Sequence, residues 1–111
     1  MDARLPAHLE VSGLVRRVES EGGFATIVQR GEKDAGTILI LTLERGKNAA
    51  LWERMPQLDG SRPFTLSRQE NTEKKQEFSE YLERRRLQDP DCWVVELDIV
   101  NAGRFIETMV T

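Results

Sequence analysis

The stretch Thr37–Leu43, TILILTL, constrains the fold more than any other part of this sequence. It is apolar at nearly every position, whereas a strand with one solvated face alternates apolar and polar residues. A continuous apolar run of this length is typical of a strand that is covered on both faces. The sequence therefore predicts a β-sheet in which Thr37–Leu43 is the central strand.

Two further strand-like segments flank this run. Phe24–Arg30 precedes it and Ala49–Met55 follows it, and both mix apolar with charged positions. The connecting segments, GEKDAG and ERGKN, are short, polar and glycine-bearing, which is typical of hairpin turns. These features predict an antiparallel meander in which Gly31 and Gly36 supply the positive-φ positions of the first turn.

Helical periodicity appears on either side of these strands. Pro6–Ser20 carries apolar residues at helical spacing behind a proline suited to a first turn. A second helix follows the capping-box spacing of Ser67–Glu70, or starts later with Asn71 or Thr72 as its cap. It ends at Asp89, because the residue before a proline is displaced from the helical region.

Three shorter segments complete the expected architecture. Phe64–Ser67 is expected as an edge strand, Cys92–Val100 as an alternating strand and Phe105–Val110 as a last strand-like run. The predicted fold is a single α+β domain over residues 1–111, in the order α-β-β-β-(β)-α-β-(β). It contains an antiparallel sheet, with a meander of three to four strands plus one or two C-terminal strands. Two helices are expected to pack on one face of this sheet.

Composition and charge narrow the classes of function. Sixteen basic against nineteen acidic residues give a net charge of −3, so the whole chain has no basic surplus for nucleic acid or anionic lipid. One cysteine and one histidine exclude an internal disulfide and a Cys/His zinc site. The sequence lacks a signal-peptide profile and an apolar run of about 20 residues that could span a bilayer. A cytoplasmic protein without membrane contact is expected.

The glycines of the segment 31–36 do not indicate a phosphate-binding loop. Such loops lead from a strand into a helix, whose amino end supplies free N–H groups and the dipole. Here another strand is expected to follow, and Ala-Gly-Thr stands where a P-loop has Gly-Lys-Ser/Thr. No cofactor is predicted.

Two sets of residues are candidates for a metal-dependent hydrolase or nuclease. Asp91, Glu96 and Asp98 lie in the most acidic stretch, although their spacing matches no calcium loop and a solvated strand face is the simpler interpretation. The second set follows from the expected order of elements, which is similar to that of restriction-endonuclease-like nucleases. Its members are Asp34, Glu44 and Lys47, with Glu10 contributed by the first helix.

Nucleophilic chemistry has little support in the sequence. His8 and Ser12 are four residues apart on one expected helix, without the strand-to-helix elbow of a hydrolase. Cys92 stands between Asp91 and Trp93, and acidic and apolar neighbours raise the pKa of a thiol.

The remaining hypothesis is a non-enzymatic module that binds a protein partner or a second copy of itself. Open sheet edges can pair with another chain, and Trp and Arg are common anchors of interfaces. The residues expected at such an interface are Trp52, Arg54, Arg84 and Arg85. Nucleic-acid binding through Arg84–Arg86 ranks last, because glutamates stand beside these arginines.

Three motifs of this chain resemble a known family. They are VSGLVRR (Val11–Arg17), the glycine-bearing segment Gln29–Ile38 and DPDCWVVE (Asp89–Glu96), of which the last is the most specific. Together they are similar to DUF1491, a small alphaproteobacterial family of proteins of unknown function. The resemblance covers most of the chain and is poor over Trp52–Glu70. It implies a small bacterial cytoplasmic protein and assigns no catalytic residue.

Overall fold

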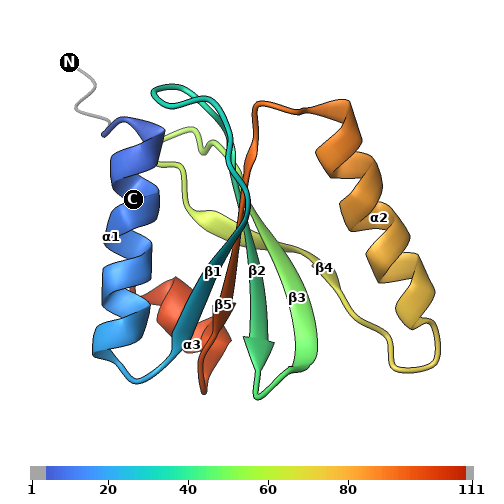
Figure 1. The fold of residues 1–111 in the computed structure, drawn as a ribbon. Coiled ribbons are helices and arrows are strands. Elements are labelled where there is room, and N and C mark those ends of the chain that lie inside the picture. The colour runs from blue at the N-terminus through green and yellow to red at the C-terminus, as the bar shows by residue number, and fades with distance from the viewer. Residues whose placement is uncertain (1–4, 110–111) are drawn as a thin grey trace.

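The computed structural model describes residues 5–109, and within them it shows a five-stranded mixed sheet and three helices (Figure 1). This confirms the predicted α+β class. None of the helices in this range has the length and apolar composition needed to cross a bilayer. In chain order the elements are α1 (Ala7–Ser20), β1 (Phe24–Gln29), β2 (Ile38–Glu44), β3 (Lys47–Arg54), β4 (Phe64–Gln69), α2 (Lys75–Gln88), β5 (Trp93–Asp98) and α3 (Ala102–Glu107).

Strand β2 lies at the centre of the sheet, whose order is β1-β5-β2-β3-β4. Its side chains are buried on both faces, because Ile38 and Ile40 join one hydrophobic cluster while Leu39 and Leu41 join another. The position predicted from TILILTL is therefore confirmed. Burial of such a run on both faces is a large source of hydrophobic stabilisation for a chain of this size.

The predicted meander is correct only for β2, β3 and β4. These strands pair antiparallel in chain order, and Arg45 (φ 54°) and Gly46 (φ 76°) form the tight turn between the first two. Strand β1 does not pair with β2. Strand β5 is inserted between them, parallel to β2 and antiparallel to β1. The segment between β1 and β2 therefore crosses the end of β5 and is not a hairpin turn.

The glycines of this crossing segment have a different role from the predicted one. In residues 5–109 the positive-φ glycines are Gly22, Gly46 and Gly60, so Gly31 and Gly36 are not among them. Both instead pack against the main chain that leads into β5. A Cβ atom on Gly31 would lie 2.3 Å from the Asp91 carbonyl oxygen, and one on Gly36 would lie 2.7 Å from it. Glycine is required here because the two chain segments approach too closely for a side chain.

The same crossing segment caps helix α1. The N–H groups of Ala7 and His8 donate hydrogen bonds of 2.9 Å to the carbonyl oxygens of Asp34 and Lys33. Amides in the first turn of a helix have no partner within the helix, so these bonds satisfy groups that would otherwise need a side chain or water. The segment thus connects the amino end of α1 to the start of β5.

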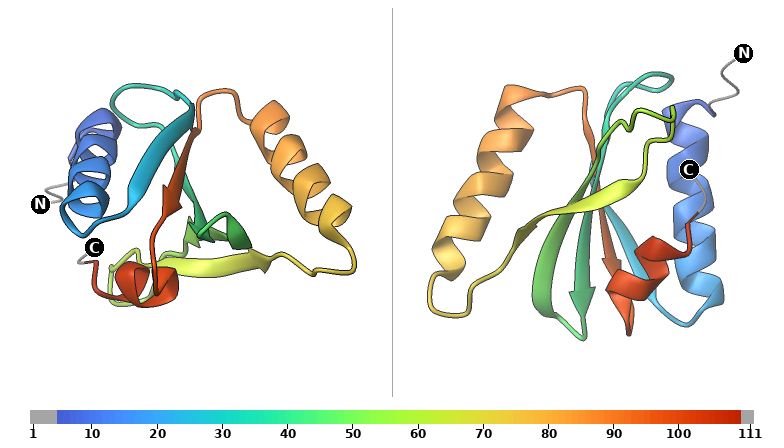
Figure 2. Two further views of the ribbon diagram at one scale, coloured as in Figure 1. Left: turned by 60° about the horizontal axis from the view of Figure 1, so that its bottom comes forward. Right: turned by 180° about the vertical axis from the view of Figure 1, so that it is seen from behind.

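The helices lie on opposite faces of the sheet (Figures 1 and 2), so the predicted packing of both long helices on one face is wrong. Helices α1 and α3 cover the face that carries Ile40 and Val95. Helix α2 covers the other face, where Phe78 packs in a cluster with Leu39 and Leu51. Because β2 is apolar on both sides, it needs a helical cover on each face, and two helices on one face would leave the other exposed to water.

The last segment is a helix, so the predicted strand-like run at Phe105–Val110 is also wrong. Asn101 adopts a left-handed conformation (φ 57°) and turns the chain into α3. Ala102, Phe105 and Ile106 are buried against the sheet at the i, i+3, i+4 spacing of a helix. Val110, the end of the predicted run, lies outside the described residues.

Strand β4 confirms the predicted edge strand and extends it to Gln69. The capping pattern predicted at Ser67–Glu70 is therefore wrong, because most of it belongs to this strand. Helix α2 begins at Lys75 with Lys74 at its N-cap, so the alternative cap at Asn71 or Thr72 is also wrong. The Asn71 side chain instead accepts a hydrogen bond of 2.9 Å from the Glu73 N–H in the turn before the helix.

Substitution of Gly31 tests the close contact between the crossing segment and β5. We expect Gly31→Ala to lower the free energy of unfolding by about 2 kcal/mol or more, because the new methyl group overlaps the main chain of Asp91 and Cys92. Gly13→Ala is the matched control, since a Cβ there meets no atom within 4 Å in the middle of α1. This control should raise stability by up to about 1 kcal/mol. Urea denaturation measures both values, and equal effects would contradict the close contact.

Candidate functional site

The four residues predicted at an interface fall into two separate groups. Trp52 and Arg54 lie on the α1/α3 face, where the Trp52 indole N–H donates to Thr42 Oγ1 at 2.8 Å. Trp52 packs against the core of that face, beneath α3 at Gly103. Arg84 and Arg85 lie on α2, across the sheet. The structure therefore does not assemble the four residues into one surface patch.

Arg54 forms a half-buried ion pair. Its guanidinium donates two hydrogen bonds to the Glu10 carboxylate, one of them 3.1 Å long, and lies 4.6 Å from the centre of the Phe64 ring. Its side chain is 18% exposed. These contacts join α1 to the edge of the sheet, which gives Arg54 a role in packing.

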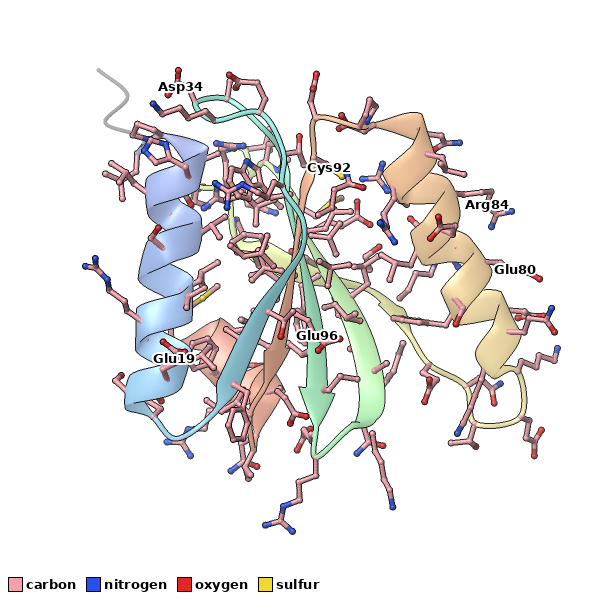
Figure 3. All side chains as sticks on the ribbon, viewed as in Figure 1. Glu19, Asp34, Glu80, Arg84, Cys92 and Glu96 are labelled. Atoms are coloured by element: carbon pink, nitrogen blue, oxygen red, sulfur yellow. The ribbon has the colours of Figure 1, made fainter. Side chains whose placement is uncertain are left out.

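The acidic candidates on β5 do not converge. Asp98 accepts hydrogen bonds from the Arg45 and Gly46 amides at 2.7 and 3.0 Å, which hold the β2–β3 turn. Asp91 precedes β5 at its opposite end, about 20 Å away at the rise of a strand. Figure 3 shows Glu96 on the sheet, far from Asp34 at the tip of the crossing segment. Within residues 5–109 no three His, Cys, Asp or Glu side chains are grouped so as to hold a metal ion.

The second metal set is also dispersed. Asp34 lies before β2 and its carbonyl oxygen caps α1, whereas Glu44 lies at the far end of β2 and accepts a hydrogen bond from the Asn101 N–H at 3.2 Å. Lys47 begins β3 beside Glu44, across the turn. Asp34 is thus separated from the other two by the length of a strand.

The nucleophile candidates are occupied by other contacts. Ser12 Oγ donates to the His8 carbonyl oxygen at 3.0 Å, and His8 Nδ1 lies 3.1 Å from the Lys33 carbonyl oxygen. Neither contact joins the hydroxyl to the imidazole. Cys92 is buried, and burial together with the nearby Asp89 carboxylate raises the pKa of its thiol. A raised pKa keeps this thiol protonated and weakly nucleophilic.

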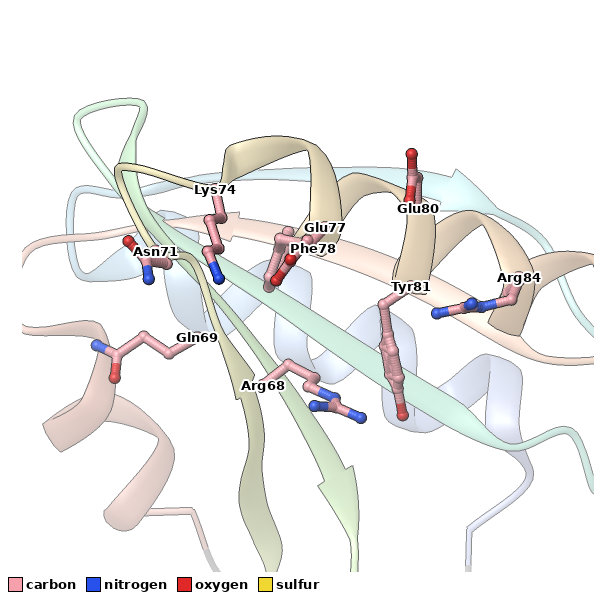
Figure 4. A pocket seen from close by; sticks show the side chains of 9 residues that line it. All are labelled: Arg68, Gln69, Asn71, Lys74, Glu77, Phe78, Glu80, Tyr81 and Arg84. Carbon is pink, nitrogen blue, oxygen red and sulfur yellow. The ribbon is translucent and has the colours of Figure 1, made fainter.

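A groove of about 370 Å³ lies between edge strand β4 and helix α2 (Figure 4). It combines cationic, acidic, amide and aromatic side chains from β4, the turn after it and α2. Its lining residues are Arg68, Gln69, Asn71, Lys74, Glu77, Phe78, Glu80, Tyr81 and Arg84. The groove thus contains Arg84 of the predicted interface, together with residues that the sequence did not indicate.

The groove has an excess of positive charge, although the whole chain is acidic. Among the described residues Arg68, Lys74 and Arg84 have no carboxylate partner within 4 Å. The Arg68 guanidinium lies 4.4 Å from the centre of the Tyr81 ring, and Figure 4 shows Arg84 pointing toward the same ring from the other side. Of the two glutamates that line the groove, Glu80 points away from it in this view, whereas Glu77 points into it. The cations are therefore available to an anionic ligand.

Glu53 of β3 forms hydrogen bonds with both walls of the groove, β4 and α2. It accepts hydrogen bonds from Ser67 of β4 and from two residues of α2, Arg85 Nη2 at 2.7 Å and Tyr81 Oη at 3.4 Å. Burial disfavours the charged carboxylate, but the bonds from Ser67 and Arg85 outweigh it and lower the pKa of Glu53. Burial likewise opposes the charge of Arg85, and Glu53 raises the pKa of that guanidinium. One carboxylate therefore connects β3, β4 and α2, and it sets the position of Tyr81 in the groove.

Strand β4 leaves main-chain groups open beside the groove. In the described chain it pairs only with β3. The Met55 N–H donates to the Pro63 carbonyl oxygen and the Glu70 N–H donates to the Ala49 carbonyl oxygen, so Pro63 and Glu70 face β3. Successive residues of a strand point their N–H and C=O groups in opposite directions, and the register of β4 shifts between Leu66 and Arg68. Leu66, counted from Pro63, and Gln69, counted back from Glu70, therefore both face outward. Gln69 also lines the groove. An extended ligand could thus meet a strand edge and a cationic wall at once.

The Glu53 contacts predict a defined pH dependence of stability. Because the pKa of Glu53 is lower in the folded state than its ordinary value of 4.5, the stability that this residue contributes is complete above pH 4.5. That contribution is lost as the pH falls through the lowered value. We expect Glu53→Gln to reduce the free energy of unfolding at pH 7 by about 1–2 kcal/mol and to flatten the loss of stability below pH 4.5. Denaturation series at several pH values measure both effects, and parallel curves for the two proteins would contradict the assignment.

The comparisons with known proteins agree on a single family. The model for proteins of unknown function named DUF1491 matches residues 5–107. A DUF1491 family protein from Caulobacter crescentus CB15, solved by crystallography, is 32% identical with a TM-score of 0.76, over 86% of this chain and 89% of that chain. Protein Atu0922 from A. tumefaciens, solved in solution, is 32% identical with a TM-score of 0.72, over 90% of both chains. The comparison with curated proteins found no match. The resemblance of the three sequence motifs is thus confirmed, and the chain belongs to the DUF1491 family.

Proposed function

We propose that this protein is a non-enzymatic binding module that takes an extended, acidic segment of a partner protein into the groove between β4 and α2. The observation that carries the proposal is the meeting of an open strand edge with three cations that have no carboxylate partner within residues 5–109. An extended segment would add to the sheet beside β4 and bond to the outward main-chain groups of Leu66 and Gln69.

The groups that surround the added segment indicate that its side chains should be acidic. Alternate side chains of a strand point to the same face of the sheet, so every second residue of the ligand would point toward α2. On that face they meet Arg68 and Arg84 on either side of the Tyr81 ring, and Lys74 at the start of the helix. Carboxylates suit these groups because guanidinium binds carboxylate with paired hydrogen bonds.

The two walls of the groove are held in place by contacts with the sheet. Phe78 is the buried residue of α2, and the remaining contacts of this helix with the sheet are made largely by Tyr81, Leu82 and Arg85. The bond network of Glu53 keeps α2 and β4 in register beside the groove. A preformed groove of this kind reduces the entropy that a ligand loses when binding orders the site.

Peptide binding can be measured directly by fluorescence anisotropy. The probe is a labelled peptide of alternating Glu and Val residues, and its matched control alternates Lys and Val. We expect the acidic peptide to bind with a dissociation constant of about 1–100 μM and to weaken as salt is added, because exposed charges are screened. Tighter binding of the Lys-Val peptide, or no binding of the acidic peptide at millimolar protein, would overturn the proposal.

Charge reversal locates the binding site on the protein. Arg68→Glu and Arg84→Glu should each weaken the acidic peptide by about tenfold or more, since each replaces an attraction by a repulsion. Arg16→Glu is the matched control, because Arg16 is an exposed arginine on α1, across the sheet from the groove. Equal losses in all three variants would indicate a response to net charge alone. An oligonucleotide that binds more tightly than the peptide would favour the nucleic-acid alternative.

A further inference from the structure

The opposite edge of the sheet has a different chemistry from the β4 edge. Strand β1 pairs only with β5 among the described residues, so its outer side is open. It contains neither proline nor lysine, residues that commonly protect an edge from pairing, and its register with β5 is regular from Phe24 to Ile27 and shifts only before Gln29. Three of its six residues are exposed and apolar: Phe24 is 76% exposed, Ile27 38% and Val28 37%. An edge of this composition favours pairing with another strand.

The hydrogen bonds of β5 show which groups of β1 are open. The N–H groups of Trp93 and Ile99 donate to the carbonyl oxygens of Thr37 and Leu43, so the odd-numbered residues of this segment face β2. Because the direction alternates along a strand, the even-numbered residues Glu96 and Asp98 face β1. Their partners in the register are Thr26 and Phe24, which must face back toward β5. The main-chain groups of Ala25 and Ile27 therefore point away from the sheet.

The two ends of β1 carry opposite charge. Near its start lies Glu21, at the end of α1, in an exposed ion pair with Arg17, and Glu96 is next to Thr26 on β5. After its end comes Arg30, which lies 5.3 Å from the centre of the Trp93 ring and has no carboxylate partner in the described chain. In antiparallel pairing, the basic end of a second β1 strand would lie beside the acidic start of the first. The acidic start of the second strand would then lie beside the basic end of the first. The edge is thus complementary in charge to a second copy of itself.

We propose that two copies of this chain associate through β1, in antiparallel pairing about a twofold axis, to form a continuous ten-stranded sheet. The number of strands follows from the five in each copy. A closed twofold arrangement uses the same surface of both copies and leaves neither β1 edge open. The exposed Phe24 side chains would be covered in this dimer, which removes apolar surface from water.

Sedimentation velocity over a range of concentrations tests the dimer. We expect the wild-type protein to shift from monomer to dimer as concentration rises, with a dissociation constant that increases with salt. Phe24→Lys should raise this constant by about tenfold or more, because it replaces the exposed apolar group by a charge that edge strands use against pairing. Ile27→Pro removes an outward N–H group while leaving the bonds to β5 in place, and should act in the same direction.

Leu66→Lys is the matched control, since Leu66 is a 45% exposed apolar residue on the other edge strand. It should leave the dissociation constant unchanged. Circular dichroism checks that the variants are folded. The side chain of Phe24 is mostly exposed, so Phe24→Lys should fold, and it decides the result if Ile27→Pro does not fold. A wild-type monomer at every concentration, or equal weakening by Leu66→Lys and Phe24→Lys, would overturn the proposal.

Discussion

The insertion of β5 between β1 and β2 is the constraint on which the rest of the structure depends. It requires the segment between β1 and β2 to cross the start of β5 in close contact, which the missing side chains of Gly31 and Gly36 permit. The same segment caps the first turn of α1, so the helix, the crossing and the inserted strand form one connected unit. Because β5 is the last strand within residues 5–109, β1 and β2 become linked in the sheet only after most of the sequence is available.

The sequence predicted local features well and the insertion poorly, for a physical reason. The apolar run TILILTL, the tight turn at Arg45–Gly46 and the edge position of β4 depend on residues close together in the chain. The pairing of β1 depends on β5, which lies some 65 residues later. A polar segment with two glycines fits a hairpin turn as well as a crossing, and only the distant partner distinguishes the two. The helical form of α3 was missed because Phe105 and Ile106 also suit a strand.

The candidate groove was partly visible in the sequence. Arg84 and Arg85 were expected at an interface from their residue type, and the structure places the first in the groove and the second beneath it, bound to Glu53. Arg68, Lys74 and Tyr81 gave no signal, because single residues of these types are common on solvated surfaces. Their proximity arises from the packing of α2 over β4, which no spacing in the sequence encodes. The i, i+3 separation of Tyr81 and Arg84 was the one local indication that these two side chains share a helix face.

The two open edges of the sheet allow the proposed interactions to occur together. Strands β1 and β4 are separated by the full width of the sheet, so a partner strand on one edge does not obstruct the other. The edges also differ in chemistry, since β1 presents exposed apolar residues whereas the groove beside β4 presents the cations of Arg68, Lys74 and Arg84. A dimer through β1 would therefore carry two acidic-peptide grooves at its outer ends. A ligand with two acidic segments could bridge both grooves, and its effective affinity would then depend on the length of chain between the segments.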